Sequence, residues 1–280
     1  MHSRKSLLVH WERLLQASGV DAPRLSAQVL LAHVLGIARL DMLLDVHSPV
    51  DEAACARMEN LGRRRSAGEP VAYLTGVKEF YGLDFTVGPQ VLIPRPETEL
   101  IIDLMREALD ENACLRVLDI GTGSGILAVT CATLFPRLDV VAVDISFEAL
   151  RIARANAAAH GASDRISWVL GDLVQALRLC SFDVVVANLP YVPTTAKPAL
   201  SPEVVLQEPH IALFSGLDGL DCYRELARNL AGRMKPGARL WCEIDCSQGL
   251  AMTELFAPIS KTVRIIKDYA GLDRVAAVVF

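Results

Sequence analysis

The sequence lacks an excess of basic residues: 28 Lys and Arg stand against 33 Asp and Glu, for a net charge of −5. A chain of that charge has no general attraction to nucleic-acid phosphates, although a local basic patch remains compatible with it. The sequence also lacks Cys-x-x-Cys pairs. Its seven cysteines are odd in number and scattered along the chain. We therefore expect reduced thiols, with neither a disulfide framework nor a bound metal.

Long apolar runs are absent as well. No stretch approaches the roughly 20 residues that a membrane-spanning helix needs, and charges interrupt the N-terminal segment where a secretory signal would have its apolar core. We expect a cytoplasmic protein without a membrane partner. The hydrophobic content of 52% against 22% charged residues is typical of a well-packed globular protein. A length of 280 residues indicates one large domain and a smaller one.

The apolar pattern changes twice along the chain. In residues 1–67 apolar residues recur at helical spacing, which predicts a small helical bundle. Residues 68–96 hold short apolar runs at 71–74 and 83–87 and two closely spaced prolines, which predict a β-hairpin followed by a rigid connector. From 97 to 280 strand and helix patterns alternate, as in a doubly wound parallel α/β sheet. Two closely spaced runs at 263–266 and 274–280 predict an antiparallel hairpin at one edge.

A glycine-rich loop follows the first predicted strand of the large domain, in the order Asp119-Ile-Gly-Thr-Gly-Ser-Gly125. Its glycines allow a tight turn and a close approach to a ligand. Asp119 would repel a pyrophosphate but would orient a cationic amino-acid group. Asp144 ends the second strand, where an acid accepts hydrogen bonds from both ribose hydroxyls. This arrangement favours S-adenosylmethionine (SAM) over a dinucleotide, although a plain glycine turn is the alternative.

Two further positions complete the predicted cofactor site. Asp172, just after the third strand, is placed to read an adenine amino group, or it is an ordinary loop aspartate; Leu173 is its apolar neighbour. The candidate cofactor-binding residues are Asp119, Gly121, Thr122, Gly123, Ser124, Gly125, Asp144, Asp172 and Leu173, together with Asn188 of the second candidate site described next.

The second candidate site is Asn188-Leu189-Pro190-Tyr191, which follows the apolar run 182–187. That run predicts a buried parallel strand, so Asn188 would lie at its carboxyl end, where open α/β sheets bind ligands. Pro190 stiffens the turn, and Tyr191 adds a flat aromatic face. The set suits a planar group bearing an NH2, and its candidate catalytic residues are Asn188, Pro190 and Tyr191. An ordinary strand-to-loop turn is the alternative.

With these motifs in place, the chain resembles the HemK/PrmC family of protein-(glutamine-N5) methyltransferases. The resemblance runs nearly end to end, through residues 68–76 (GEPVAYLTG), 93–99 (IPRPETE), the glycine loop, Glu208-Pro209 and 268–274 (DYAGLDR). It implies a Rossmann-like, mostly parallel seven-stranded sheet that binds SAM. It also implies methylation of the Gly-Gly-Gln glutamine of class 1 peptide chain release factors. The implied substrate-binding residues are Asn188, Leu189, Pro190, Tyr191 and Arg95, and we expect a monomer.

The resemblance also implies a mechanism. The Asn188 side-chain oxygen and a backbone carbonyl in the turn would accept hydrogen bonds from the substrate NH2 and hold its nitrogen in line with the methyl group. Tyr191 would pack against the amide plane. The methyl donor is already activated, so no metal is required. Arg95 and Glu97 in the connector either pin the hairpin or touch the substrate.

Two residues depart from the family pattern. The usual motif is Asn-Pro-Pro-Tyr, and Leu189 replaces its first proline, so we expect less stiffness but unchanged chemistry. Leu173 stands where some members carry an aromatic residue. The form Asn-Leu-Pro-Tyr also occurs in rRNA adenine-N6 dimethyltransferases, which keeps an N6-adenine methyltransferase acting on nucleic acid as an alternative. A non-catalytic SAM-binding protein is another. The net negative charge favours a protein substrate.

Overall fold

The computed structural model describes residues 2–177 and 182–280, which form two compact units. The first unit runs to Val77 and also includes Ser201–Gln207, and the second comprises Lys78–Leu200 and Glu208–Phe280. Cys180, which we expect to be a reduced thiol, lies outside the described residues. Each unit has its own hydrophobic core.

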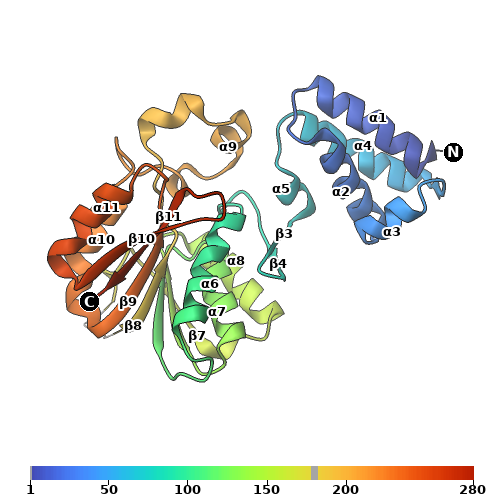
Figure 1. Cartoon of the computed structure of the whole chain (residues 1–280). Coiled ribbons are helices and arrows are strands. Elements are labelled where there is room, and N and C mark those ends of the chain that lie inside the picture. The colour runs from blue at the N-terminus through green and yellow to red at the C-terminus, as the bar shows by residue number, and fades with distance from the viewer. Residues whose placement is uncertain (1, 178–181) are drawn as a thin grey trace. The chain divides into compact units, whose positions relative to one another are not determined.

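The first unit is a helical bundle (Figure 1). Its helices are α1 (Arg4–Ala17), α2 (Pro23–Leu35), α3 (Arg39–Leu44), α4 (Glu52–Ser66), α5 (Val71–Thr75) and α9 (Pro202–Gln207), with short strands β1 (His2–Ser3) and β2 (Pro49–Val50). Trp11 of α1 is buried in its core. A Cβ at Gly62 of α4 would lie 2.3 Å from the Trp11 ring, so only glycine lets α4 approach α1 this closely.

Helix α5 replaces a strand that the sequence analysis predicted for residues 71–74. Pro70 immediately precedes the helix, and Gly76 ends it with a φ of 73°. A run of four apolar residues is too short to distinguish a helix from a strand by periodicity. The expected hairpin follows instead at β3 (Val77–Phe80) and β4 (Leu83–Thr86), which pair only with each other among the described strands.

A buried ion pair joins the two segments of the first unit. The side chain of Arg65, at the end of α4, is 5% exposed, and its Nη1 lies 2.6 Å from Glu203 Oε2 of α9. The same nitrogen donates to the backbone carbonyl of Glu69. The segment 201–207 thus contacts the rest of the first unit through a specific ion pair.

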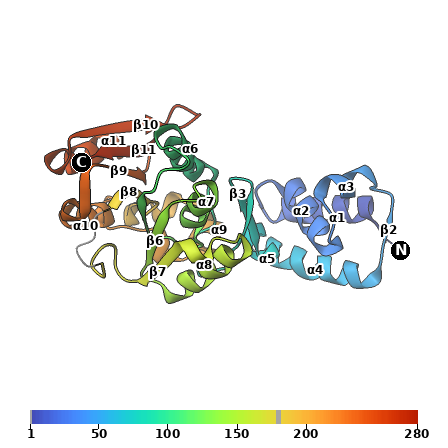
Figure 2. The ribbon, with the colours of Figure 1, turned by 90° about the horizontal axis from the view of Figure 1, so that it is seen from below.

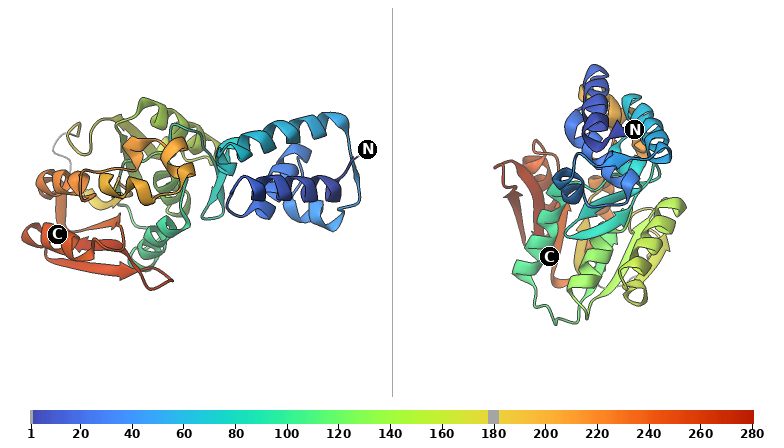
Figure 3. Two further views of the ribbon diagram at one scale, coloured as in Figure 1. Left: turned by 90° about the horizontal axis from the view of Figure 1, so that it is seen from above. Right: turned by 90° about the vertical axis from the view of Figure 1, so that its right-hand side faces the viewer.

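The second unit contains a sheet of seven strands in the described residues, ordered β10-β11-β9-β8-β5-β6-β7. The strands are β5 (Arg116–Ile120), β6 (Asp139–Asp144), β7 (Ile166–Leu170), β8 (Phe182–Ala187), β9 (Met234–Glu243), β10 (Thr262–Lys267) and β11 (Asp273–Val279). Pairing is parallel from β7 to β9, whereas β11 runs antiparallel to β9 and β10. The predicted fold class and its antiparallel edge hairpin, drawn in red in Figure 3, are confirmed.

Helices cover both faces of this sheet (Figures 1 and 2). On one face lie α6 (Glu99–Ala108), α7 (Ile126–Leu134) and α8 (Phe147–Ala159), and on the other α10 (Asp221–Leu230) and α11 (Gly249–Phe256). Alternate residues of β8 point to opposite faces: Val184 and Val186 pack in the first core, Val185 and Ala187 in the second. Short 3₁₀ helices occupy Pro96–Thr98, Ser163–Arg165, Thr194–Ala199, His210–Ala212, Ala231–Arg233 and Ala257–Ile259.

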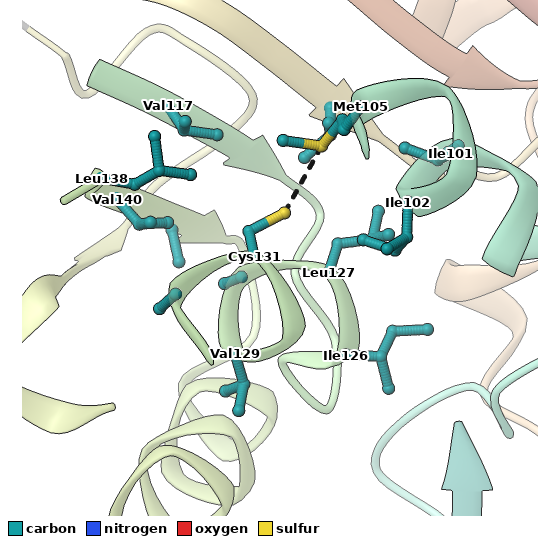
Figure 4. Packing of buried hydrophobic residues seen from close by; sticks show 14 of the residues in the cluster. Ile101, Ile102, Met105, Val117, Ile126, Leu127, Val129, Cys131, Leu138 and Val140 are labelled. Carbon is teal, nitrogen blue, oxygen red and sulfur yellow. Dashed lines mark hydrogen bonds between the residues drawn. The ribbon is translucent and has the colours of Figure 1, made fainter. Parts of the chain in front are cut away.

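The core beneath α6 and α7 contains a buried thiol. Cys131 is fully buried and contacts the sulfur of Met105 at 3.5 Å (Figure 4). Burial raises the pKa of the Cys131 thiol, which makes it a packing group and not a nucleophile. No described helix combines the length and apolarity needed to cross a bilayer. Within the same residues no group of three His, Cys, Asp or Glu is arranged to hold a metal.

The chain order places a switch point beside β5. It moves from β5 outward to β6 and β7 and then returns to β8 on the other side of β5. Ligands of open α/β sheets bind at such a point, outside the carboxyl ends of the strands. The glycine loop follows β5, and Asn188 follows β8, so both candidate motifs lie at this position.

Candidate active site

A pocket at the carboxyl ends of β5, β6 and β8 brings most of the predicted site residues together. The connector before α6 contributes a further wall to it. The predicted residues that line it are Arg95, Asp119, Gly121, Thr122, Gly123, Ser124, Asp144, Asp172, Leu173, Asn188, Leu189 and Pro190. Gly125 and Tyr191 do not appear in this lining.

Two glycines of the loop allow close contacts with neighbouring parts of the protein. Gly121 has a φ of 71°, and a Cβ there would lie 2.9 Å from the Leu189 side chain. Gly125 precedes α7 with a φ of 85°, and a Cβ there would meet Ala153 of α8 at 3.0 Å. Gly121 therefore lets the loop approach the Asn188 turn, whereas Gly125 lets α7 pack closely on α8.

Asp119 offers an unpaired acceptor in the pocket. Its side chain is fully buried, and Oδ2 accepts hydrogen bonds from the Thr122 hydroxyl (2.6 Å) and the Ala128 N–H (3.1 Å). Oδ1 has no hydrogen-bond partner among the described residues. Burial, with a smaller contribution from the charge of Asp144, raises the pKa of Asp119 to about 7. A buried carboxylate oxygen without a partner fits a ligand that carries an ammonium group.

Asp144 both supports the loop and faces the pocket. Its Oδ2 accepts from the Gly123 N–H and its Oδ1 from the Ser146 N–H, each at 2.8 Å. Burial raises the pKa of Asp144, and these backbone donors oppose that rise. Each oxygen keeps a second lone pair for a ligand hydroxyl. Asp172, which is exposed, and Leu173, which is half-buried, lie farther along the same pocket.

The Asn188 turn has a fixed geometry. The Asn188 Nδ2 donates to the Thr98 hydroxyl at 3.0 Å, so Oδ1 is the atom left for a ligand in the pocket. Leu189 is buried, and its side chain packs against Gly121 of the glycine loop.

Tyr191 lies behind the pocket wall. Its hydroxyl donates to Glu243 Oε1 at 2.8 Å, and its carbonyl accepts from the buried Gln248 side chain at 3.0 Å. A Cβ at Gly219, where φ is 80°, would lie 2.0 Å from that carbonyl. These contacts anchor Tyr191, which is not among the residues that line the pocket.

Three residues of this region were assigned no role by the sequence analysis: Thr98, Glu208 and Glu243. Glu208 accepts from Arg95 Nη2 at 2.5 Å and from the Ile93 N–H at 3.1 Å, so Arg95 has a structural partner while Glu97 is exposed. The sequence offered one indication for Glu243, because a charged residue inside an otherwise apolar run, Leu240–Ile244, indicates a buried, paired group. No feature of the sequence indicated a role for Thr98 by itself.

Comparison with known proteins relates both units to one group of enzymes. Residues 6–76 match the family described as the PrmC N-terminal domain, and residues 98–210 match the methyltransferase small domain. The chain is 42% identical to the release factor glutamine methyltransferase of Moorella thermoacetica, over 94% of this chain and 93% of that one. It is 41% identical to the enzyme of the same name from Nitratidesulfovibrio vulgaris, over 96% and 92%.

Solved structures show the same fold. A methyltransferase from Pyrococcus furiosus aligns with a TM-score of 0.54 and 18% identity, covering 79% of this chain and 98% of that chain. The Thermus thermophilus 16S rRNA N2 G1207 methyltransferase, solved with AdoMet and guanosine, aligns with a TM-score of 0.55 and 18% identity, covering 72% of this chain and 49% of that one. At these identities the alignments establish the architecture and not the substrate.

Proposed function

This chain belongs to the release factor glutamine methyltransferase family, and we propose that the turn beginning at Asn188 carries out that family's reaction. The reaction transfers a methyl group from SAM to the side-chain amide nitrogen (N5) of a glutamine in a peptide chain release factor. The observation that carries the proposal is the position of Asn188. It lies at the carboxyl end of β8 in the same pocket as the glycine loop, and its Nδ2 is committed to Thr98.

The proposed role of Asn188 follows from the chemistry of an amide. An amide nitrogen is a poor nucleophile because its lone pair is delocalised into the carbonyl group. Asn188 Oδ1, together with a backbone carbonyl of the turn, accepts hydrogen bonds from the substrate NH2 and fixes its direction toward the methyl group. The same acceptors stabilise the positive charge that develops on nitrogen. SAM supplies the methyl group on a sulfonium, so the chain needs neither a metal nor a strong base for this step.

The cofactor is SAM, and the pocket residues fit its parts. Asp119 Oδ1 is placed for the ammonium group of the methionine moiety, since that buried oxygen has no partner among the residues described. Asp144 takes the ribose hydroxyls with its remaining lone pairs, and Asp172 takes the adenine amino group. Leu173 provides apolar contact at the adenine end.

The proposal also covers the protein that carries the glutamine, the oligomeric state of the enzyme and its compartment. We propose class 1 release factors as the partners, with the glutamine of their Gly-Gly-Gln motif as the acceptor, and a monomeric enzyme acting in the cytoplasm. A flexible, glycine-flanked loop enters a pocket without the unstacking that a nucleobase requires. The net charge of −5 gives no general attraction to RNA, which argues against an adenine substrate.

Labelled SAM will test this choice of substrate. We expect incorporation into a purified class 1 release factor and none into purified rRNA, because only the protein presents an unstacked planar amide to the pocket. Mass spectrometry should locate a single methyl group on the motif glutamine. A release factor with that glutamine replaced by glutamate is the matched control and should remain unlabelled. Comparable labelling of rRNA would instead support the adenine methyltransferase, and no labelling of either would support a non-catalytic SAM-binding protein.

The affinity for SAM should depend on pH through Asp119. The raised pKa of about 7 means that the unliganded carboxyl is protonated below that pH. The ammonium group pairs with the charged form, so binding releases a proton, and affinity should fall by up to about tenfold for each pH unit below 7. Calorimetry between pH 5.5 and 8 measures this directly. Asp119→Asn should bind SAM more weakly and without this pH dependence; a wild-type affinity that is flat across the range would contradict the assignment.

A further inference from the structure

A hydrogen-bonded chain runs from Asn188 into the protein core. Asn188 Nδ2 donates to Thr98 Oγ1 at 3.0 Å, and Thr98 Oγ1 donates to Glu243 Oε2 at 2.5 Å. The other oxygen of Glu243 accepts from the Tyr191 hydroxyl at 2.8 Å. Thr98 is 0% and Glu243 1% exposed. These residues come from three separate parts of the fold: the end of β8, the start of α6 and the end of β9.

The donors and acceptors allow one direction along this chain while Glu243 is ionised. An amide nitrogen only donates, and a carboxylate only accepts. The Thr98 hydroxyl has a single proton, which therefore points to Glu243 while its oxygen accepts from Asn188. The chain leaves the Asn188 Oδ1 on the side of the pocket. With a neutral carboxyl donating to Thr98 instead, the hydroxyl proton would be free to bond Oδ1 and the amide would turn around.

Turning the amide would reverse its function. Asn188 would then present its NH2 to the NH2 of the substrate, and two donors cannot bond each other. Rotation of the amide about its last torsion is otherwise inexpensive, because that torsion is broad. The proposed reaction requires Oδ1 in the pocket, so another group must fix the amide in that orientation.

We propose that Thr98 and Glu243 are positioning residues that hold the Asn188 amide with its oxygen toward the substrate. This inference rests on the proposed function, because it assigns a role within the same reaction. Neither residue lines the pocket, so both act through Asn188. Glu243 also fixes the Tyr191 hydroxyl, and it thus holds the first and last residues of the turn from one carboxylate.

The surroundings of Glu243 act on its charge in both directions. Burial raises the pKa of this carboxyl, and the nearby charge of Glu97 adds to the rise. The hydrogen bonds from Thr98 and Tyr191 and the charge of Arg274 on β11 oppose that rise. The two hydroxyls that Glu243 orients therefore favour its ionised form, and the network depends on all of its members.

Thr98→Val tests the proposal with little change of volume. Without the hydroxyl the amide loses its preferred orientation, so the kcat for release-factor methylation should fall at least about tenfold. The SAM Kd and the KM for the release factor should stay within about threefold of wild type. Thr98→Ser restores the hydroxyl and should recover most of the rate. Thr130→Val is the matched control: Thr130 is fully buried on α7, and its hydroxyl has no partner among the described residues.

A double-mutant comparison distinguishes positioning from general stabilisation. If Thr98 acts through Asn188, Thr98→Val should lower kcat no further in an Asn188→Ala background. A structural role would lower kcat, or the thermal midpoint, similarly in both backgrounds. Glu243→Met is an independent test that removes both acceptor oxygens at a similar side-chain length, and it should give the same selective loss of kcat at unchanged SAM affinity.

Three outcomes would overturn the proposal. One is a Thr98→Val enzyme with kcat within threefold of wild type, and another is an equal effect of Thr98→Val with and without Asn188. Should Thr98→Val fail to fold, a Glu243→Met enzyme with wild-type kcat would overturn the proposal as well. In each of these cases the proposed function would still stand, provided that the wild-type enzyme methylates the release factor. Absence of transfer by the wild type would overturn both.

Discussion

Replacing Asn188 by alanine is expected to lower kcat for release-factor methylation by about 10²–10³-fold, the usual effect of removing one preorganised group that stabilises developing charge. The SAM affinity should change little, because the glycine loop, Asp119 and Asp144 remain in place. Single-turnover transfer of labelled methyl from SAM, together with calorimetry of SAM binding, measures the two effects separately.

The matched control for this substitution is Asn229→Ala. Asn229 is on α10, and its side chain bonds only Glu225 of the same helix among the described residues. That variant should keep wild-type turnover. An Asn188→Ala enzyme whose turnover stays within a few-fold of wild type would contradict the assigned role, because the reaction would then proceed without its proposed acceptor.

Replacing Asp144 by alanine is expected to weaken SAM binding by at least about tenfold. The substitution removes a charged acceptor for two ribose hydroxyls, each such bond being worth about 1.5–3 kcal/mol, and about 1.4 kcal/mol corresponds to a tenfold change in Kd. It also leaves the N–H groups of Gly123 and Ser146 without their acceptor, so the loop itself should loosen. Calorimetric titration with SAM measures the loss.

Asp139 supplies the control for this second substitution. It begins the same strand, β6, that Asp144 ends, and its exposed carboxylate pairs with Arg116 at 3.3 Å, far from the ligand end of the sheet. Asp139→Ala should leave SAM affinity unchanged. Binding of NADH by the wild type more tightly than SAM would reject the cofactor itself, and equal affinities of the two variants would reject the role of Asp144.

The parts of the fold that the sequence predicts best are the strands buried on both faces. The run 182–187 coincides with β8, since a short β-branched run bounded by polar residues has few other solutions in an alternating α/β pattern. Helix α11 was not predicted. It begins at Gly249 after Gln248, which makes no side-chain cap, so the usual starting pattern is missing.

Some residues of the candidate site were predictable from the sequence, and others were not. The residues at strand ends, such as Asp119, Asp144 and Asn188, were predictable because their position follows from the strand pattern and the rule for carboxyl ends. The partnership of Thr98 with Glu243 was not, since 145 residues separate them and no spacing in the sequence relates one to the other. The partnership of the Tyr191 hydroxyl with Glu243 was unpredictable for the same reason, since 52 residues separate the two.

The ion pair between Arg65 and Glu203 has a consequence for the order in which the chain is made. During synthesis from the amino terminus, the helical unit emerges with Arg65 long before its carboxylate partner exists. The unit emerging from the ribosome therefore lacks one partner of this ion pair until α9 has been translated. Since the Asn188 turn precedes α9 in the chain, the helical unit is completed only after that turn has been synthesised.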